Sequence, residues 1–346
     1  MIPYISILLF VIFWINVEKF SLNRRAFWIP ILSLSLFAGM RSYQVGTDTG
    51  SYVANYINNL DPNYFEFNDN VEKGYQLFDY FILHLTHNYF WLFFITALFV
   101  VYSYFKLIKK YSENYLLSVI IFVSFGTYTF FFNGLRQGVA MAIFTYAISA
   151  LLNKKLWLYL IICLVASTFH TSALVMMPFY FVVNAKLKLI YKMVLVMLTT
   201  FIFASPLIKY MAEDNTRYEA YTAINDYGGM LTLAFYILIA AFILILKNKI
   251  RVKNEVFTGL LTLYLSGISL LIPIAMLGAG ASGPQRILYY FSWTLMIILP
   301  VIINIFKNKI VKLSFIILCI LYYYLTTSRF SNLTPYILNS SFEIIS

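Results

Sequence analysis

A series of long apolar segments runs through the whole chain and limits its fold more than any other feature. A helix that crosses a bilayer needs about 20 predominantly apolar residues, and lipid offers the backbone no hydrogen-bond partners. Only 11% of the residues are charged, whereas a soluble domain has about 25%. The sequence therefore predicts an all-α, polytopic membrane protein that forms one integral membrane domain over residues 1–346. The predicted spans are residues 2–17, 26–40, 89–105, 115–132, 134–152, 189–208, 229–246, 255–277, 287–306 and 311–327.

Residues 156–184 form a further apolar segment, which is long for one helix and is interrupted by the polar stretch STFHTS around His170. Basic residues of membrane proteins collect in cytoplasmic loops. The lysine clusters at Lys154 and Lys188, on either side of the segment, fall on the same face only if it crosses twice, as a pair of short helices. We therefore expect about twelve crossing segments with both termini outside. The predicted outer loops are residues 41–88 and 209–228.

The two faces of this topology carry different kinds of basic residue. The inner loops hold fifteen lysines and three arginines, whereas the outer segments hold two lysines and five arginines. Arginine binds phosphate or carboxylate through two parallel hydrogen bonds, which lysine does not. The outer face is therefore expected to bind an anion with several phosphate oxygens. The net charge of +11 does not indicate nucleic acid, because the basic residues sit in short clusters between apolar spans. The outer arginines are Arg41, Arg136, Arg217, Arg286 and Arg329.

Two stretches place polar side chains at predicted outer helix starts. FFNGLRQGVAMAI, residues 131–143, puts Asn133, Arg136 and Gln137 where the helix dipole and unpaired N–H groups favour anions. The alternative is an arginine that only reaches out to lipid headgroups. GAGASGPQRILYYF, residues 278–291, is a loop of small residues that leads to Arg286, and small residues let the backbone approach a ligand.

A histidine and several tyrosines complete the polar outer face. ASTFHTSALVMMP places His170 among hydroxyl groups at the turn between the two short helices. Histidine is readily poised as a base near neutral pH and is usually functional close to an apolar interior, although a hydrogen-bonded helix cap is the alternative. Tyrosines such as Tyr52 in the outer loops can stack on sugar rings or can belong to the aromatic belt at the membrane edge.

Five short motifs follow one another along the chain: RSYQVGTDTGSY (41–52), VEKGY (71–75), NGLRQGVA (133–140), FHTSAL (169–174) and GPQR (283–286). With these motifs the chain resembles the EpsG family, which is allied with the Wzy-type polysaccharide polymerases. The resemblance implies polymerisation of exopolysaccharide, capsule or O-antigen repeat units on an undecaprenyl-pyrophosphate carrier. It further implies a bacterial cytoplasmic membrane, an active site facing the periplasm or exterior, and the GT-C membrane glycosyltransferase architecture of the related polymerases and ligases. It leaves open a chain-length regulator as a partner.

The reaction that the resemblance implies sets out what its site needs. Pyrophosphate is a good leaving group whose developing charge is stabilised by fixed cations, and the acceptor hydroxyl has to lose a proton to a base. We expect Arg136 and Arg286 to hold the donor pyrophosphate, and Arg41 and Arg217 to bind the second pyrophosphate or to orient the sugar. No metal ion or cofactor is needed for this chemistry.

The predicted base is His170 or Asp48. An unperturbed histidine titrates near neutral pH, whereas Asp48 needs a raised pKa or a partner, and it has the alternative of pairing with Arg41 to hold the loop. The remaining expected substrate-binding residues are Gln137, Asn133, Tyr52 and Glu72.

Two other functions fit a membrane protein of this composition. A flippase or transporter of lipid-linked oligosaccharide usually has internal repeats and charges near the middle of the membrane, whereas this chain shows no repeat and carries most charges at span ends. A membrane acyltransferase would also use a histidine, but it needs an acyl-donor site on the inner face, where the loops are short and lysine-rich. The polymerase is the main prediction and the flippase is the alternative.

Overall fold

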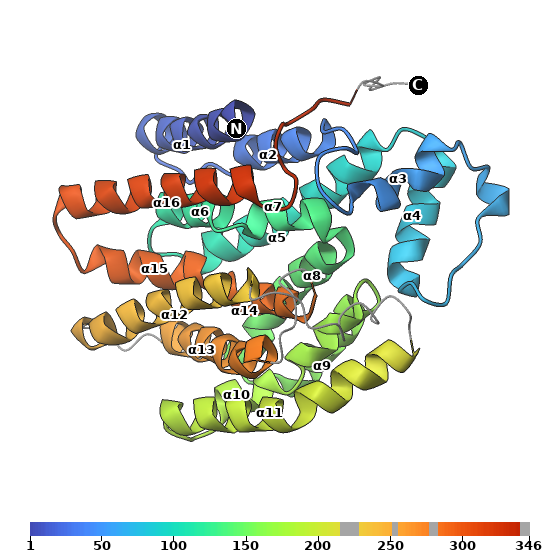
Figure 1. Cartoon of the computed structure of the whole chain (residues 1–346). Coiled ribbons are helices and arrows are strands. Elements are labelled where there is room, and N and C mark those ends of the chain that lie inside the picture. The colour runs from blue at the N-terminus through green and yellow to red at the C-terminus, as the bar shows by residue number, and fades with distance from the viewer. Residues whose placement is uncertain (215–227, 251–254, 277–282, 340–346) are drawn as a thin grey trace. The chain divides into compact units, whose positions relative to one another are not determined.

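A computed structural model describes residues 1–214, 228–250, 255–276 and 283–339 (Figure 1). The regular secondary structure of the described chain is helical, and its extended pairing is limited to one isolated bridge between Arg41 and Leu338. The all-α prediction is therefore confirmed for these residues. In chain order, the longer helices are α1 (Ile2–Leu22), α2 (Trp28–Gly39), α3 (Thr49–Ile57), α4 (Lys73–Leu85), α5 (Phe90–Tyr111), α6 (Tyr115–Ser124), α7 (Thr127–Asn133), α8 (Leu135–Leu152), α9 (Leu156–Ser167), α10 (Phe179–Asn184), α11 (Leu189–Asp214), α12 (Gly228–Leu246), α13 (Glu255–Met276), α14 (Tyr289–Ser292), α15 (Leu295–Asn304) and α16 (Lys309–Arg329). Short 3₁₀ turns are η1 (Pro62–Tyr64), η2 (Thr171–Met176), η4 (Lys247–Lys249) and η5 (Pro284–Leu288).

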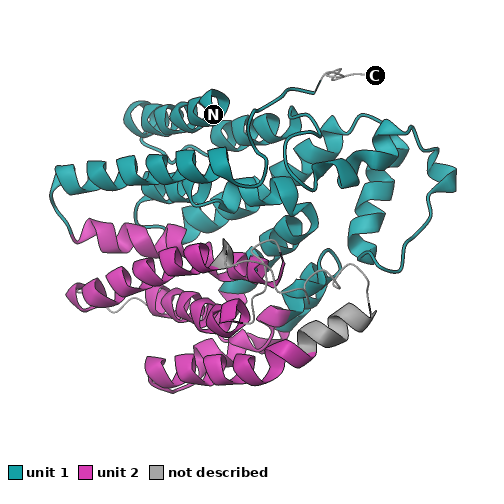
Figure 2. Ribbon diagram, in the orientation of Figure 1, with its two compact units in different colours: residues 1–148, 160–174, 306–346 teal, residues 149–159, 175–305 magenta. Residues whose placement is uncertain are grey.

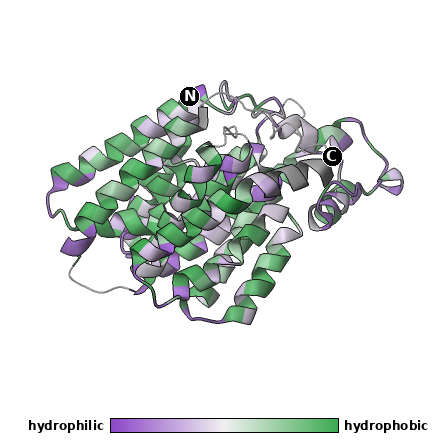
Figure 3. Cartoon of the chain, turned by 60° about the horizontal axis from the view of Figure 1, so that its bottom comes forward, coloured by the Kyte–Doolittle hydropathy of each residue, from purple (hydrophilic) through white to green (hydrophobic). Residues whose placement is uncertain are grey.

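Within the described ranges, eight helices are long and apolar enough to cross a membrane, or nine if the bent pair Pro284–Ser292 and Leu295–Asn304 is one span. Apolar residues dominate the helices, and polar residues gather in loops and at helix ends (Figure 3). The protein is thus a polytopic helical membrane protein. Three shorter apolar helices, Trp28–Gly39, Leu156–Ser167 and Thr171–Asn184, occupy the remaining predicted segments. The count of about twelve crossings stays a prediction, because these three are too short to cross by length alone. The outward termini and the GT-C architecture also stay predictions.

The chain packs into two compact units that interleave in sequence (Figure 2). Unit 1 consists of residues 1–148, 160–174 and 306–346, and unit 2 of residues 149–159 and 175–305. Because each unit is assembled from separate stretches, neither is a contiguous domain that could be cut from the chain at one point. The prediction of one integral membrane domain over residues 1–346 stays a prediction.

The polar stretch STFHTS divides residues 156–184 as expected. Helix α9 ends at Ser167, and after a short turn that contains His170 the chain continues into η2 and α10. Glu72, just before α4, accepts a hydrogen bond from the backbone N–H of Thr171 at 3.2 Å. His170 therefore lies at the same end of unit 1 as the start of α4.

Contacts inside unit 1 bring together the segment ends that were predicted to lie outside. Tyr4 at the start of α1 donates to the carbonyl of Leu333 at 2.8 Å, and the N–H of Ser42, after α2, donates to Ile337 at 2.8 Å. The hydroxyl of Tyr89, before α5, donates to Asn339 at 2.6 Å. Residues 330–339 therefore cross the ends of three helices and hold the loop after α2 in place.

Predicted inner ends also meet one another in unit 1. Arg25, which precedes α2, donates to the carbonyl of Lys109 near the end of α5 at 2.6 Å, and the Lys109 ammonium lies 4.9 Å from the centre of the Phe27 ring. The basic clusters around Arg25 and Lys109 thus gather at one end, while Arg41 and Tyr89 belong to the other. Within unit 1, the helix ends with basic clusters are thus separate from the helix ends near Arg41 and Tyr89.

The outer loop after α2 folds into two amphipathic helices. Helix α4 runs roughly across the direction of α1, α2 and α16, and α3, α4 and the loop between them lie beyond one end of α2 (Figure 1). Helix α4 has one buried and one exposed side. Its buried side carries Tyr75, Asp79 and Ile82, while Leu77 and Phe81 on the opposite side are exposed. This agrees with an interfacial helix.

In unit 2, α13 forms the centre and α11 lies at the edge. Of the most apolar part of each helix, 83% is buried in α13 but only 17% in α11. Gly267 lets α13 pack closely on α14, because a Cβ at this position would stand 2.4 Å from the Phe291 side chain. The exposed apolar face of α11 is what a lipid-facing helix requires.

Candidate functional site

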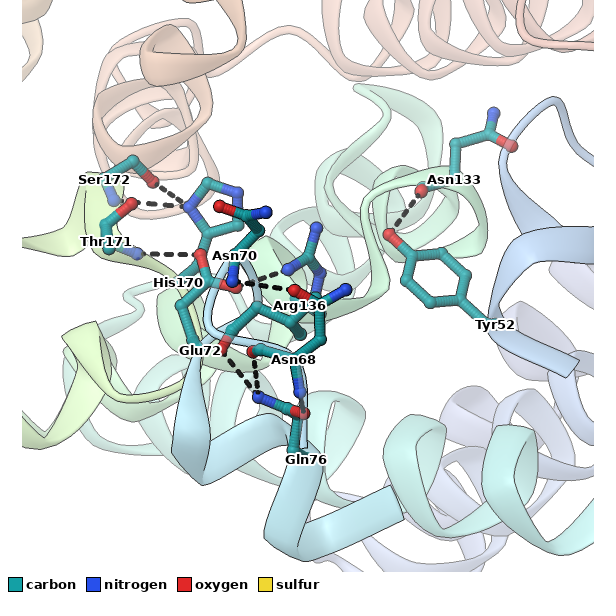
Figure 4. Close-up of polar contacts among 11 residues, drawn as sticks. Tyr52, Asn68, Asn70, Glu72, Gln76, Asn133, Arg136, His170, Thr171 and Ser172 are labelled. Carbon is teal, nitrogen blue, oxygen red and sulfur yellow. Dashed lines mark hydrogen bonds and ion pairs between the residues drawn. The ribbon is translucent and has the colours of Figure 1, made fainter. Parts of the chain in front are cut away.

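The break between α7 and α8 creates a helix start at the polar end of unit 1. Gly134 separates the two helices, so Arg136 stands in the first turn of α8, where unpaired N–H groups and the dipole favour negative charge. The guanidinium of Arg136 forms an ion pair with the carboxylate of Glu72, and the side chains are only 9% and 8% exposed. Taking two charges out of water is favourable only when they are well paired. The pair therefore fixes the direction of the Arg136 side chain (Figure 4). We call the group formed by Arg136, Glu72, His170, Tyr52 and Tyr75 the cluster.

Glu72 connects two further elements to Arg136. It precedes the first residue of α4, and its second carboxylate oxygen accepts the N–H of Thr171 at 3.2 Å. The start of α4 also docks directly on the turn before His170, since the N–H groups of Gly74 and Tyr75 donate to the carbonyl of Thr168 at 2.8 and 3.3 Å. Position 74 has to be glycine for this contact, because a Cβ there would lie 2.7 Å from the carbonyl oxygen of Thr168.

Two tyrosines stand beside the ion pair. The ring centre of Tyr75 lies 5.8 Å from the Arg136 guanidinium carbon, within range of a cation–π contact. Tyr52 meets Tyr75 edge to face at 6.0 Å between ring centres, and its hydroxyl donates to the carbonyl of Asn133 at 3.1 Å. Tyr52 is half-buried, whereas Tyr75 is buried. The cluster thus joins a cation to aromatic side chains from α3 and α4.

His170 is held in one orientation by the residue two positions later. The backbone N–H of Ser172 donates to Nδ1 of His170 at 3.2 Å, and the Ser172 hydroxyl lies 2.7 Å from the same nitrogen (Figure 4). A backbone N–H only donates, so Nδ1 has to accept with its lone pair. In the neutral ring the proton then resides on Nε2. A charged imidazolium would place a second donor against the Ser172 N–H, so this geometry favours neutral His170.

Asn133 links the end of α7 to two other segments through its side-chain amide. Its side-chain oxygen accepts the N–H of Thr47 at 2.7 Å, and its side-chain nitrogen donates to the carbonyl of Ser331 at 2.9 Å. It therefore ties the end of α7 both to the loop 41–48 and to residues 330–339. Asp48, at the start of α3, is half-buried and accepts the Thr47 hydroxyl at 2.9 Å.

Arg41 is fully buried and lies between two aromatic rings. Its guanidinium carbon is 3.9 Å from the centre of the Phe93 ring and 4.3 Å from that of Phe132, and one nitrogen donates to the carbonyl of Ala38 at 2.5 Å. Burial lowers the pKa of Arg41 to about 10, which leaves it charged at neutral pH. The ion pairs found among the described residues do not include one with Asp48. Such a covered cation has the surroundings of a structural group.

The remaining predicted site residues are Gln137, Arg286 and Arg217. Gln137 is buried in the first turn of α8, next to Arg136. Arg286 is half-buried in η5 of unit 2. Arg217 lies outside the described residues.

Sequence reasoning missed two residues next to the cluster. Ser172 determines the tautomer of His170. The only sequence signal for this role was that Ser172 follows His170 by two residues in FHTSAL. Asp79 is buried on α4, where the Tyr56 hydroxyl donates to it at 2.8 Å, and burial raises the pKa of its carboxyl to about 6. In the sequence Asp79 is an acid within the predicted outer loop 41–88, which gave no reason to expect a buried carboxyl.

Comparison with known protein families decides the family question. Residues 24–338 match the EpsG family, and this range contains the whole cluster and both units' helices except α1. The chain belongs to the EpsG family. No curated protein and no solved structure matches the sequence. Membership in the EpsG family suggests a membrane protein of exopolysaccharide biosynthesis, whose substrates are related to polysaccharides.

Proposed function

We propose that this EpsG-family protein polymerises oligosaccharide repeat units linked to undecaprenyl pyrophosphate, at the outer face of the bacterial cytoplasmic membrane. The observation that carries the proposal is the Arg136–Glu72 pair at the start of α8, beside His170 and Tyr52. This cluster offers a fixed cation, a helix start, a neutral histidine and aromatic surface, which together suit a sugar attached to a pyrophosphate. Exopolysaccharide, capsule and O-antigen are the polymer classes that such a reaction builds.

In the proposed reaction, Arg136 binds the pyrophosphate of the donor. A guanidinium has five N–H donors, and the ion pair with Glu72 directs them without using all of them. A hydroxyl oxygen of the incoming lipid-linked repeat forms a bond to the anomeric carbon of the growing glycan. The bond from that carbon to the pyrophosphate oxygen breaks, and the leaving lipid pyrophosphate takes the electron pair. Arg136 stabilises the negative charge that develops there, a contribution of several kcal/mol in a water-poor site.

The proton of the acceptor hydroxyl goes to a base, for which His170 and Asp48 were the two predicted candidates. Because Nδ1 of His170 accepts from Ser172, the neutral ring offers an Nε2–H donor rather than a second lone pair. We assign His170 to a hydrogen bond with the donor pyrophosphate. Asp48 is the proposed base, because its carboxylate is half-buried and belongs to the loop that Asn133 fixes beside the start of α8.

The other predicted residues receive proposed roles according to their surroundings. Tyr52 stacks on a sugar of the substrate, since its side chain is partly exposed and its hydroxyl is anchored. Gln137 and Asn133 support Arg136 and the loop 41–48. The predicted roles of Arg286 at the donor pyrophosphate and of Arg217 at the second pyrophosphate or the sugar stay predictions, because Arg286 belongs to unit 2 and Arg217 lies outside the described residues. The proposed anion site excludes Arg41, because its guanidinium is completely covered.

The proposal is tested with purified full-length protein and a synthetic lipid-linked repeat unit. Wild type is expected to produce a ladder of longer lipid-linked glycans, and Arg136→Ala to lose at least a hundredfold in rate. Arg329→Ala is the matched control, because Arg329 is also an outer arginine but is exposed at the end of α16. In cells that lack the protein, loss of polymer with single repeats still exported supports the polymerase. Loss of all exported repeats would instead indicate the alternative, a flippase.

A further inference from the structure

A cavity in unit 2 lies far along the chain from the residues of the proposed site. It has a volume of about 350 Å³ and is formed by the start of α11, the turn η4 and the start of α13. This volume falls within the range of small-molecule sites, about 300–1,000 Å³. We name it the lysine pocket, because two of its lining residues are lysines. The lining consists of Leu187, Leu189, Lys192, Lys247, Asn248, Ile250, Phe257, Thr258, Leu261 and Thr262.

The pocket contains positive charge without a balancing acid. Lys192 is only 7% exposed, and its ammonium donates to the carbonyl of Val183 at 2.9 Å, which uses one of its three N–H donors. Lys247 is half-buried on the other side. No lining residue is acidic, and the ion pairs within the described part of the chain, Arg24–Glu18 and Arg136–Glu72, involve neither lysine. A buried ammonium is costly unless an anion accompanies it.

The apolar part of the lining continues onto the outer face of α11. Leu189 and Lys192 line the pocket, and the exposed apolar residues Leu195, Leu198 and Ile202 follow Lys192 on the same helix at spacings of three and four residues. These positions share one side of α11, which is the lipid-facing edge of unit 2. A ligand that fits has a negatively charged head beside the lysines and a hydrocarbon chain along α11.

We propose that the lysine pocket binds the phosphate headgroup of an anionic phospholipid from the surrounding bilayer, with its acyl chains on the exposed face of α11. Lysine serves as a compact point charge for phosphate, and basic pockets between transmembrane helices are suited to anionic headgroups. Under the predicted topology, the pocket opens to the inner leaflet, where the lysine-rich loops lie. The phospholipid would hold the beginnings of α11 and α13 together by neutralising Lys192. This inference does not depend on the proposed polymerase activity.

The test measures lipid binding to the full-length protein in detergent by native mass spectrometry and by thermal unfolding. The lipids are phosphatidylglycerol as anionic probe and phosphatidylcholine as zwitterionic probe, with inorganic phosphate as a third ligand. We expect phosphatidylglycerol to bind at one saturable site and to raise Tm, whereas phosphatidylcholine and inorganic phosphate leave Tm unchanged. Ligand that binds only the folded state stabilises it in proportion to the logarithm of its concentration above Kd.

Matched variants locate the site. Lys192→Met keeps the apolar stem but removes the charge, and it is expected to weaken phosphatidylglycerol binding at least fivefold, as is Lys247→Met. Lys155→Met is the control, because Lys155 is an exposed lysine of the same unit outside the pocket, and its affinity should equal that of wild type. If Lys192→Met does not fold, Lys247→Met decides the question. Equal weakening in Lys155→Met, or no weakening in the pocket variants, overturns the proposal. Inorganic phosphate that stabilises as strongly as the lipid would overturn the lipid assignment.

Discussion

The ion pair between Glu72 and Arg136 gives the most direct quantitative prediction. Both side chains are more than nine-tenths buried, so removing one partner leaves the other as an uncompensated charge. Breaking a buried pair in this way costs roughly 3–5 kcal/mol. We therefore expect Glu72→Gln and Arg136→Met each to lower the free energy of unfolding by about this amount. The double variant should lose little more stability than either single variant. With both partners replaced, no unpaired charge remains at either position.

A double-mutant cycle measures this coupling. The free energy of unfolding is determined by titrating the purified protein with a denaturing detergent, for wild type, the two single variants and the double variant. The expected coupling energy is about 3 kcal/mol, at the upper end of values for residues in contact. Arg329→Met is the control, because Arg329 is exposed at the end of α16, and substitutions at exposed positions change the free energy of unfolding by about 0.5 kcal/mol or less. Additive effects of the two substitutions would refute the reasoning.

The same cycle distinguishes a structural pair from an anion site. In Glu72→Gln, the freed Arg136 lacks its carboxylate, and a pyrophosphate that binds there takes its place. Pyrophosphate at about 100 times its Kd should then restore about 2.7 kcal/mol, and should stabilise Glu72→Gln more than wild type. If pyrophosphate stabilises neither protein, Arg136 has no role in binding this anion and the proposed donor site fails.

Three further predictions concern the residues around this pair. His170→Gln retains a donor near the position of Nε2 and should keep polymerase rates within about tenfold of wild type, whereas His170→Ala should lose about a hundredfold or more. If His170→Gln is as inactive as His170→Ala, His170 is the base instead. Because burial raises the pKa of the Asp79 carboxyl from 3.8 to about 6, the folded state holds this proton to higher pH than the unfolded state, so the stability it contributes is lost as pH rises through about 6. Asp79→Asn should therefore remove this pH dependence and be about 3 kcal/mol more stable than wild type above pH 7, and an identical pH profile in the two proteins would contradict the assignment. Gly74→Ala places a Cβ 2.7 Å from the carbonyl oxygen of Thr168 and should lower the free energy of unfolding by roughly 1–3 kcal/mol, whereas Gly50→Ala, whose new Cβ has its nearest contact at 4.0 Å, should be neutral or slightly stabilising when both are measured by detergent titration.

The lysine-to-arginine asymmetry selects one face of the predicted topology but does not distinguish one arginine from another. It led to the prediction of an anion site at the start of α8, where Arg136 meets Glu72, and that site stays a prediction. It gave the same weight to Arg41, which has an identical charge and lies equally close to a predicted span end. Arg41 is enclosed by Phe93 and Phe132, and these rings come from distant parts of the chain. A count of charges contains no information about such enclosure.

The sequence by itself determined the helical membrane class, the approximate positions of the apolar segments and the break at His170. It also indicated that Glu72, Arg136 and His170 lie near helix ends on the same predicted face. These properties depend on local hydropathy, length and charge, which each segment carries independently of its neighbours. Tertiary structure alone decided that Glu72 pairs with Arg136 across 64 residues of sequence and that residues 330–339 hold the loop after α2. Such contacts depend on which side chains packing brings within a few ångströms and covers from water, and that is a property of the folded chain rather than of any one segment.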